Sequence, residues 1–324
     1  MRCTSKLLCI ICAVSLLFTG CGTSQVALEK EYDTYSYHNS FTNQEQDVDV
    51  DFYAKDLCVT NTINFGLEGT YAEVAQGGGV FDITTNEVLY SQNLFKKLYP
   101  ASTTKILTAY IIIRDCNLSA VTTISESAAD QASDSSTCGL NAGDNVTIND
   151  LLYGLMLYSG NDAAEALAEY HSGSVEAFAE EMTKTAHELG ATNSQFKNPS
   201  GLPDKQHYTT IYDMYLIFNQ ALQQEKFVEI INSSSKSATY TNKNGNTVEK
   251  TYYNGNRYLT GREKTPEGFQ VIGGKTGTTY DAGYCLVLYS KNPEGHDIIS
   301  IVFKADCAHN LYLLMGQILN KYAK

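Results

Sequence analysis

The sequence of 324 residues carries little charge, and most of that charge is negative. Asp and Glu number 36 against 23 Lys and Arg, which gives a formal net charge of −13, and no run of basic residues interrupts the acidic excess. Because a phosphate backbone would repel such a chain, nucleic-acid binding is not expected. Hydrophobic residues make up 43% of the chain and charged residues only 18%, so it is too apolar to remain disordered. The length allows one large domain or two ordinary ones.

Long hydrophobic runs are also missing, with one short exception at the N-terminus. Twelve uncharged residues, 7–18, follow Arg2 and Lys6 and are too few to span a bilayer comfortably, so they predict a secretory signal. The run ends in the letters FTGC, which resemble the site at which bacterial prolipoproteins are cleaved and lipidated on the cysteine, here Cys21. We expect residues 1–20 to be a lipoprotein signal peptide and the protein to sit at the outer face of the cytoplasmic membrane. An ordinary signal peptide or an uncleaved anchor would also export the chain.

Apolar periodicity is absent from the next stretch. From Gly22 to about Asp56 the sequence is polar and acidic, which is typical of a linker rather than a packed unit. We expect residues 21–66 to form an acidic tether and residues 67–324 to form the domain.

Nine cysteines would suggest a disulfide framework, but three of them lie in the first twelve residues. Five remain beyond Cys21, and this odd number leaves at least one unpaired. Bridges are compatible with an exported protein, but buried free thiols explain the same residues equally well. None of the five has metal-ligand spacing, so neither a metal nor a cofactor is expected. The five are Cys58, Cys116, Cys138, Cys285 and Cys307, and the candidate bridges are Cys116 to Cys138 and Cys285 to Cys307.

Strand-like segments lie at both ends of the remaining chain, with helix-like segments between them. This order predicts an α+β domain in which an antiparallel β-sheet is flanked by helices. The expected strands are a hairpin in 74–90, a second hairpin that turns at Asn244 and Gly245, and three strands that begin at Gln270, Gly283 and Asp297. The expected helices are 102–114, 147–158, 162–171, 174–189, 210–223 with a cap at Thr210 and Asp213, and 311–322.

Three short motifs single out one group of residues. Ser-x-x-Lys occurs three times, at Ser102, Ser194 and Ser233, and Ser-x-Asn also occurs three times, but Lys-Thr-Gly occurs only at Lys275. Only Ser102 is followed by a Ser-x-Asn, at Ser159, before Lys275 is reached. Their order therefore selects one set of motifs.

These residues together can perform acyl transfer. A serine hydroxyl needs an adjacent base, and a lysine three positions further along a helix shares its face, so Lys105 should lie beside Ser102. Burial and a second cation, Lys275, would lower the pKa of Lys105 and keep it neutral. The backbone N–H groups of Ser102 and Thr278 could stabilise an oxyanion, and glycines 273, 274 and 277 could let a substrate approach the strand. Taken singly, each residue has a plainer explanation as a cap, a turn residue or a solvated charge.

The segments around these motifs resemble the serine D-Ala-D-Ala carboxypeptidases, which are low-molecular-mass penicillin-binding proteins. The resemblance runs from about Ala72 to the C-terminus and covers the segments YPASTTKILT around Ser102, LLYGLMLYSGNDAA around Ser159, FKNPSGLPD near residue 200 and IGGKTGT around Lys275. It implies a penicillin-recognising, β-lactamase-like fold. It also implies removal of the terminal D-Ala from peptidoglycan stem pentapeptides, with β-lactams as covalent inhibitors.

By the same resemblance, each motif has a role. Ser102 is the acylated nucleophile and Lys105 its base, while Ser159 relays the proton and Asn161 holds the substrate amide. The carboxylate-binding edge is formed by Lys275, Thr276, Gly277 and Thr278. His207 is expected to be structural.

Two departures and two rival functions qualify this expectation. Only 47 residues follow Gly277, so the C-terminal β-rich domain of many members is expected to be missing, with a lipid on Cys21 anchoring the protein to the membrane instead. Tyr158 replaces a proline common in relatives. A class A-like β-lactamase shares the motifs but uses a glutamate after the second motif, and none lies between Asn193 and Asn198. The other rival is a non-catalytic lipoprotein that binds penicillin or muropeptides.

Overall fold

The computed structural model describes residues 54–324, which form one compact unit. The expected signal peptide, the lipidation site at Cys21 and most of the expected tether lie outside the described residues. Residues 54–66, which fall within the expected tether of residues 21–66, pack on the domain. Cys58 is fully buried and its N–H donates to Tyr215 Oη, while Phe65 pairs with Ser91 at the edge of the sheet. The sequence of residues 54–66 lacks the apolar periodicity that predicts a packed segment, so these contacts could not be predicted from it.

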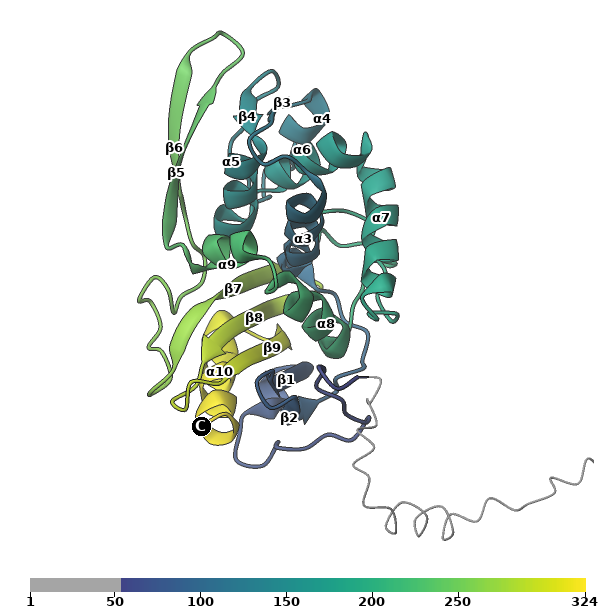
Figure 1. The fold of residues 1–324 in the computed structure, drawn as a ribbon, viewed down its shortest axis with the longest axis vertical. Helices are drawn as coiled ribbons and strands as arrows, with labels where there is room; N and C mark the ends of the chain where they lie inside the picture. The colour runs from purple at the N-terminus through teal and green to yellow at the C-terminus, as the bar shows by residue number, and fades with distance from the viewer. Residues whose placement is uncertain (1–53) are drawn as a thin grey trace, which may run out of the picture. The chain divides into compact units, whose positions relative to one another are not determined.

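A five-stranded antiparallel sheet forms the lower half of Figure 1, in the order β2-β1-β9-β8-β7. It joins the two ends of the domain, since β1 pairs with β9. This confirms the predicted α+β architecture and its first and last strands. The strands are β1 (Gly77–Asp82), β2 (Glu87–Gln92), β7 (Gln270–Thr279), β8 (Gly283–Lys291) and β9 (Asp297–Ala305).

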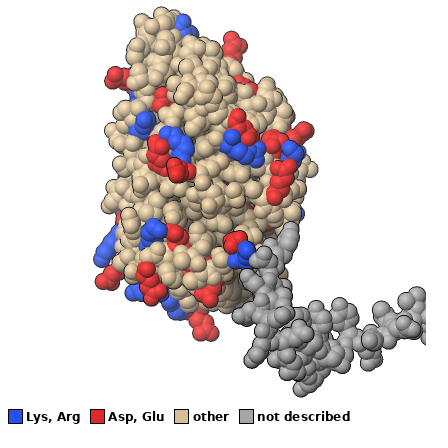
Figure 2. Space-filling view, viewed as in Figure 1, with Lys and Arg blue, Asp and Glu red and all other residues tan. Residues whose placement is uncertain are grey.

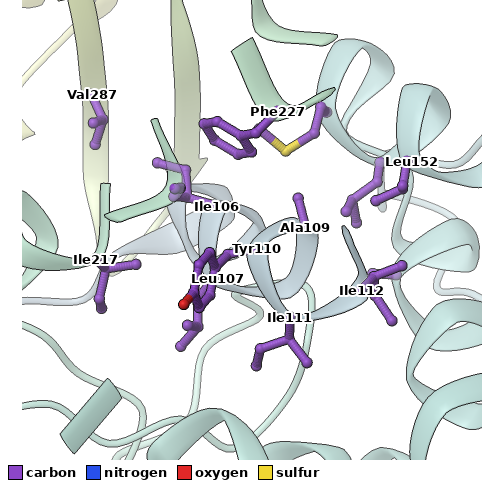
Figure 3. Packing of buried hydrophobic residues seen from close by; sticks show 14 of the residues in the cluster. Ile106, Leu107, Ala109, Tyr110, Ile111, Ile112, Leu152, Ile217, Phe227 and Val287 are labelled. Atoms are coloured by element: carbon purple, nitrogen blue, oxygen red, sulfur yellow. The ribbon is translucent and has the colours of Figure 1, made fainter. Parts of the chain in front are cut away.

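The two faces of this sheet are covered by different helices. Alternate residues of a strand point to opposite faces, and on β8 Leu286 and Leu288 belong to the core under α10 (Ala308–Tyr322), whereas Cys285 and Val287 belong to the larger core. The larger core lies around α3 (Lys105–Asp115), whose apolar side chains Figure 3 shows from close by. The strands are therefore buried on both sides, and the central strand β9 reads as an almost unbroken apolar run.

The helices around α3 carry the second of the three motifs. The helix predicted over 147–158 is α5 (Ile148–Tyr153) followed by a π-helical turn (Gly154–Tyr158), and α6 (Asn161–Ser172) starts after the Ser159-Gly160 junction. Helical periodicity does not distinguish the two kinds of turn, so this change of geometry was not predicted. The remaining helices of the layer are α7 (Val175–Glu188), α8 (Ile211–Ala221) and α9 (Glu225–Asn232), of which α9 was not expected. The Thr210 hydroxyl accepts from the Asp213 N–H as predicted.

A second, four-stranded sheet has the order β3-β4-β5-β6. The predicted turn at Gly245 joins β5 and β6, which project as a long hairpin in Figure 1. The strands β3 and β4 have three residues each, too few to show an alternating pattern, and the short helix α4 lies between them. The bounds are β3 (Val121–Thr123), α4 (Glu126–Ala129), β4 (Asn145–Thr147), β5 (Ser235–Thr241) and β6 (Thr247–Tyr253), and single 3₁₀ turns span Ala72–Val74 (η1) and Ala101–Thr104 (η2).

Neither candidate disulfide forms: all five cysteines between residues 54 and 324 are free thiols. Cys138 packs against the Ser159-Gly160 junction, because a Cβ built on Gly160 would lie 2.4 Å from its Sγ. Within the same residues, none of the helices is long and apolar enough to cross a membrane. On the face shown in Figure 2, basic side chains lie next to acidic ones.

Candidate active site

Ser102 lies in η2, the 3₁₀ turn that leads directly into α3. Ala101, just before it, has φ +48°, a conformation that L-residues adopt at a cost and that is found at functional sites. The turn is held by the Thr103 hydroxyl, which donates to the Pro100 carbonyl at 2.7 Å. The nucleophile expected from the sequence is thus presented on a tightly bonded turn.

Lys105 is completely buried, and its amine has three polar neighbours. Nζ lies 3.2 Å from Ser102 Oγ, 2.8 Å from Asn161 Oδ1 and 2.7 Å from the Ser200 carbonyl. The last two can only accept, so they take the two N–H groups of a neutral amine and leave its lone pair directed at the Ser102 hydroxyl. Burial, and then the nearby charge of Lys275, hold the pKa of Lys105 well below its usual value. This geometry suits a base that takes a proton from Ser102.

Lys275 of the third motif lies next to Ser159 of the second motif. It is 2% exposed, and its Nζ donates to Ser159 Oγ at 3.0 Å and to the Thr276 carbonyl at 2.8 Å. Burial lowers the pKa of Lys275 to about 7. Ser159 itself has φ +64° at the end of the π-helical turn, which aims it at Lys275 rather than along the helix. Proton exchange between Ser159 and Lys275 is therefore possible without large movement.

The side chain of Asn161 lies between Lys105 and the cleft. Its Oδ1 accepts from Lys105, so only its amide NH₂ is available to a substrate carbonyl. Its backbone N–H donates to the Ser136 carbonyl at 2.8 Å, which fixes the start of α6 against the 134–136 segment.

The edge strand β7 lies against the nucleophile turn. A Cβ on Gly277 would come within 2.9 Å of the Ser102 backbone nitrogen and 3.0 Å of the Pro100 carbonyl. A Cβ on Gly273 would meet the Ile231 carbonyl of α9 at 2.3 Å. The expectation that these glycines admit a substrate is therefore wrong, because they make room for the protein's own backbone. Their effect is to seat Ser102 beside Thr278, which is exposed on the free edge of β7.

The 198–201 segment is a part of the site to which the sequence assigned no role. Asn198 Oδ1 accepts from the N–H groups of Ser200, Gly201 and Leu202, and this turn points the Ser200 carbonyl at Lys105. Gly201 has φ +88°, and a Cβ there would lie 1.9 Å from the Ala101 carbonyl. The letters NPSG belong to a segment that resembles the family, and a glycine shortly after an asparagine is typical of such a turn.

His207 is structural in the sense expected. It is 1% exposed, its Nδ1 accepts from the Lys197 N–H at 3.2 Å, and its Nε2 lies 2.9 Å from Thr104 Oγ1. Burial lowers the pKa of His207 to about 4, so the ring is neutral and can donate from Nε2. This hydrogen bond holds Thr104, the residue before Lys105, in place.

Ser102 opens into a cleft of about 300 Å³. Most of its lining is polar and uncharged, which suits a peptide. The lining residues are Ser102, Asp134, Ser135, Ser136, Asn161, Ser200, Gly201, Leu202, Pro203, Thr278, Thr279 and Tyr280. No group of three or more His, Cys, Asp or Glu side chains that could hold a metal ion occurs in the described part of the chain.

Fold and site together define a serine enzyme of the penicillin-recognising class, and comparison with known proteins agrees. Residues 73–307 match the D-alanyl-D-alanine carboxypeptidase family, and the chain belongs to this family. It is 34% identical over 241 residues to D-alanyl-D-alanine carboxypeptidase DacF of Bacillus subtilis, matching 72% of this chain and 58% of that relative. It is 33% identical over 239 residues to a D-alanyl-D-alanine carboxypeptidase of Streptomyces sp. K15, matching 70% of this chain and 80% of the relative.

Solved structures of related enzymes have the same fold. The Streptomyces K15 DD-transpeptidase superposes with a TM-score of 0.71 at 31% identity, over 76% of this chain and 96% of that one. The D-alanyl-D-alanine carboxypeptidase DacD of Francisella tularensis superposes with a TM-score of 0.66 at 25% identity, over 82% and 73% of the two chains. The chain thus spans nearly the whole K15 enzyme but little more than half of the Bacillus relative.

Proposed function

We propose that this protein is a serine D-Ala-D-Ala carboxypeptidase that removes the terminal D-Ala from peptidoglycan stem pentapeptides. The observation that carries the proposal is the buried Lys105 amine, 3.2 Å from Ser102 Oγ with its other hydrogen bonds filled by acceptors. Family membership supplies the substrate class.

Acylation begins when the neutral Lys105 takes the proton of Ser102, whose Oγ attacks the carbonyl of the penultimate D-Ala. Negative charge develops on that carbonyl oxygen, and the N–H groups of Ser102 and Thr278 stabilise it. The proton reaches the leaving amine through Ser159, which shares a hydrogen bond with Lys275. The C–N bond breaks, D-Ala leaves, and an ester on Ser102 remains for water to hydrolyse.

The terminal carboxylate of the substrate binds at β7. Lys275 supplies the positive charge, the Thr276 and Thr278 hydroxyls are the donors on either side of Gly277, and the Asn161 amide holds the upstream carbonyl. Since the pKa of Lys275 is about 7, an approaching carboxylate would shift the lysine toward its protonated form.

A class A-like β-lactamase is disfavoured by the lining of the cleft. No glutamate is among the described residues that line it, and the 198–201 turn occupies the space beside Lys105. We therefore expect the penicilloyl ester on Ser102 to persist rather than to be hydrolysed rapidly.

The direct test is release of D-Ala from a pentapeptide by the purified protein, together with labelling by fluorescent penicillin. Wild type should do both, and Ser102→Ala should do neither while keeping its melting temperature. Labelling without D-Ala release would favour the non-catalytic binder, and rapid turnover of a chromogenic cephalosporin would favour the β-lactamase.

The N-terminal sequence supports a lipid-anchored location for the enzyme. Cleavage before Cys21 and its diacylation would hold the domain at the outer face of the cytoplasmic membrane, with the acidic stretch that follows Cys21 giving it reach. Metabolic labelling with a palmitate analogue should mark wild type but not Cys21→Ala, and membrane retention of the Cys21→Ala protein would contradict the anchor.

A further inference from the structure

A second hollow, of about 400 Å³, lies outside the cleft and has an unusual lining. Half of its eight lining residues are lysines, and none is acidic. We call it the lysine groove. Its lining residues are Gln76, Lys96, Lys97, Leu98, Tyr99, Lys205, Tyr208 and Lys304.

The four lysines are not neutralised by the protein. The ion pairs between residues 54 and 324 involve other basic side chains, such as Arg114, Lys226 and Lys291, and none of the four groove lysines lies within 4.0 Å of a carboxylate. Lys96 Nζ instead donates to Gln76 Oε1 at 3.0 Å, and Lys97 Nζ lies 4.2 Å above the Tyr208 ring. On a chain with net charge −13, four clustered lysines without a carboxylate partner repel one another, and the contacts with Gln76 and Tyr208 offset this repulsion only in part.

The lysine groove adjoins the nucleophile turn. Tyr99 lies three residues before Ser102, and its carbonyl faces Cys285 Sγ of β8 at 3.9 Å. Lys304 borders Gly283, where a Cβ would come within 3.4 Å of the Lys304 Cα. The groove therefore lies at the turn end of the β7–β8 hairpin.

The same loop borders both hollows. Leu202 and Pro203 line the cleft, and Lys205 lines the groove. The pairs Thr278 with Tyr284 and Tyr284 with Ala305 form one row across the sheet, so two strand spacings, about 10 Å, separate Thr278 from the end of β9.

A bound peptide would run toward this groove. With its terminal carboxylate at Lys275, its upstream part must leave along β7 past Thr278 and Tyr280 toward the turn. An extended chain advances about 3.3 Å per residue, so a side group two or three residues upstream reaches the groove.

We propose that the lysine groove is a second anion site, which binds a free carboxylate carried by the peptide upstream of the cleaved bond. This deepens the proposed carboxypeptidase function and rests on it. Lys205 and Lys304 stand nearest the path of the peptide, and Lys96 and Lys97 extend the positive potential away from the cleft. The groove would favour peptides with an unmodified upstream carboxylate over those in which it is a carboxamide.

The test uses two peptides that end in Lys-D-Ala-D-Ala and differ at one group, the α-carboxylate of an upstream γ-linked glutamate, which is free in one and amidated in the other. The full chain carrying Ser102→Ala is titrated with fluorescein-labelled forms of each, so that Kd is obtained without turnover. We expect the free carboxylate to bind about tenfold more tightly at low salt and the advantage to shrink as salt is raised. Adding Lys205→Gln and Lys304→Gln should abolish most of that advantage and leave the Kd of the amidated peptide unchanged.

Lys243→Gln is the matched control, because it removes the same charge from an exposed position in the β5–β6 turn and should change neither Kd. Equal affinity for the two peptides, or an equal loss for both in the double variant, would overturn the proposal. Failure of the proposed function would look different: the wild type would release D-Ala from neither peptide, whatever the two Kd values are.

Discussion

The two faces of the five-stranded sheet differ in the kind of residue that they bury. Under α10 the core is apolar, with Leu286, Leu288 and Val302 of the sheet facing Leu314 and Met315 of the helix. The other face also has a large apolar core, but it buries Lys105, Lys275, His207 and Asp213, and places Ala101 and Ser159 at positive φ. Buried charge and strain cost stability, so this arrangement persists only where the surrounding packing holds it. The comparison indicates that the α10 face supplies stability and the α3 face carries the chemistry.

The largest effect is expected for Lys105→Met, which replaces a buried amine by an apolar side chain of similar length and tests whether the α3 face carries the chemistry. Loss of the base should slow acylation by penicillin about a thousandfold. The melting temperature should change little, because removal of a desolvated amine offsets the loss of the donor to Asn161 Oδ1 and the Ser200 carbonyl. Mass spectrometry of the penicilloyl protein and thermal unfolding measure the two effects. A variant that unfolds but acylates normally would reverse the assignment.

Met315→Ala on the α10 face should do the opposite. Met315 is fully buried, and truncation should lower the free energy of unfolding by about 3 kcal/mol. kcat for D-Ala release at a temperature where the variant is folded should not change. Leu313→Ala, at a position 37% exposed on the same helix, should cost about 0.5 kcal/mol or less. Urea unfolding measures both, and a fall in kcat for Met315→Ala would contradict the division between the faces.

Gly201→Ala tests how closely the site is packed. The added Cβ would lie 1.9 Å from the Ala101 carbonyl, so the backbone beside Ser102 must shift and acylation should slow about a hundredfold. Gly245→Ala is matched to it, because Gly245 has φ +80° but nothing within 4 Å of the added atom. It should lose only the stability expected of a left-handed residue. Similar acylation rates for the two variants would show that the clash is relieved without moving Ser102.

The smallest predicted effect is on the pH dependence of kcat/KM. Lys275 has a pKa of about 7, so in the free enzyme it is protonated below that pH and neutral above it. Binding of the substrate carboxylate weakens as the charge is lost, so kcat/KM should fall above about pH 7, by about tenfold per unit. Lys275→Arg should remove this fall, since a guanidinium stays protonated. A wild-type profile that is flat to pH 9 would contradict the assigned role of Lys275.

The sequence predicted the α10 face well and the site only in part. Strands β8 and β9 follow from apolar runs and α10 follows from a helical period, because each is packed mainly against its neighbours along the chain. The motif order found Ser102, Lys105, Ser159 and Lys275, since each stands in a recognisable local pattern.

What sequence could not provide was contact between distant segments. Residues 54–66 pack through single residues such as Cys58, and β4 meets β5 through one pair nearly a hundred residues apart, Asn145 with Thr241. The Ser200 carbonyl that binds Lys105 is a backbone atom, which no residue type reveals. The glycines before and within the third motif looked like openings for a substrate because what fills the space beside them comes from other segments, namely η2, α9 and β8.

The central claim is that Lys105 is neutral at working pH because it is buried beside Lys275. The pH dependence of the first-order acylation of Ser102 at saturating penicillin, followed by mass spectrometry, tests it directly. The account predicts a rate that is already on its plateau near neutral pH and falls only toward acid. A rate that rises tenfold per pH unit up to about pH 10, the ordinary pKa of lysine, would contradict it.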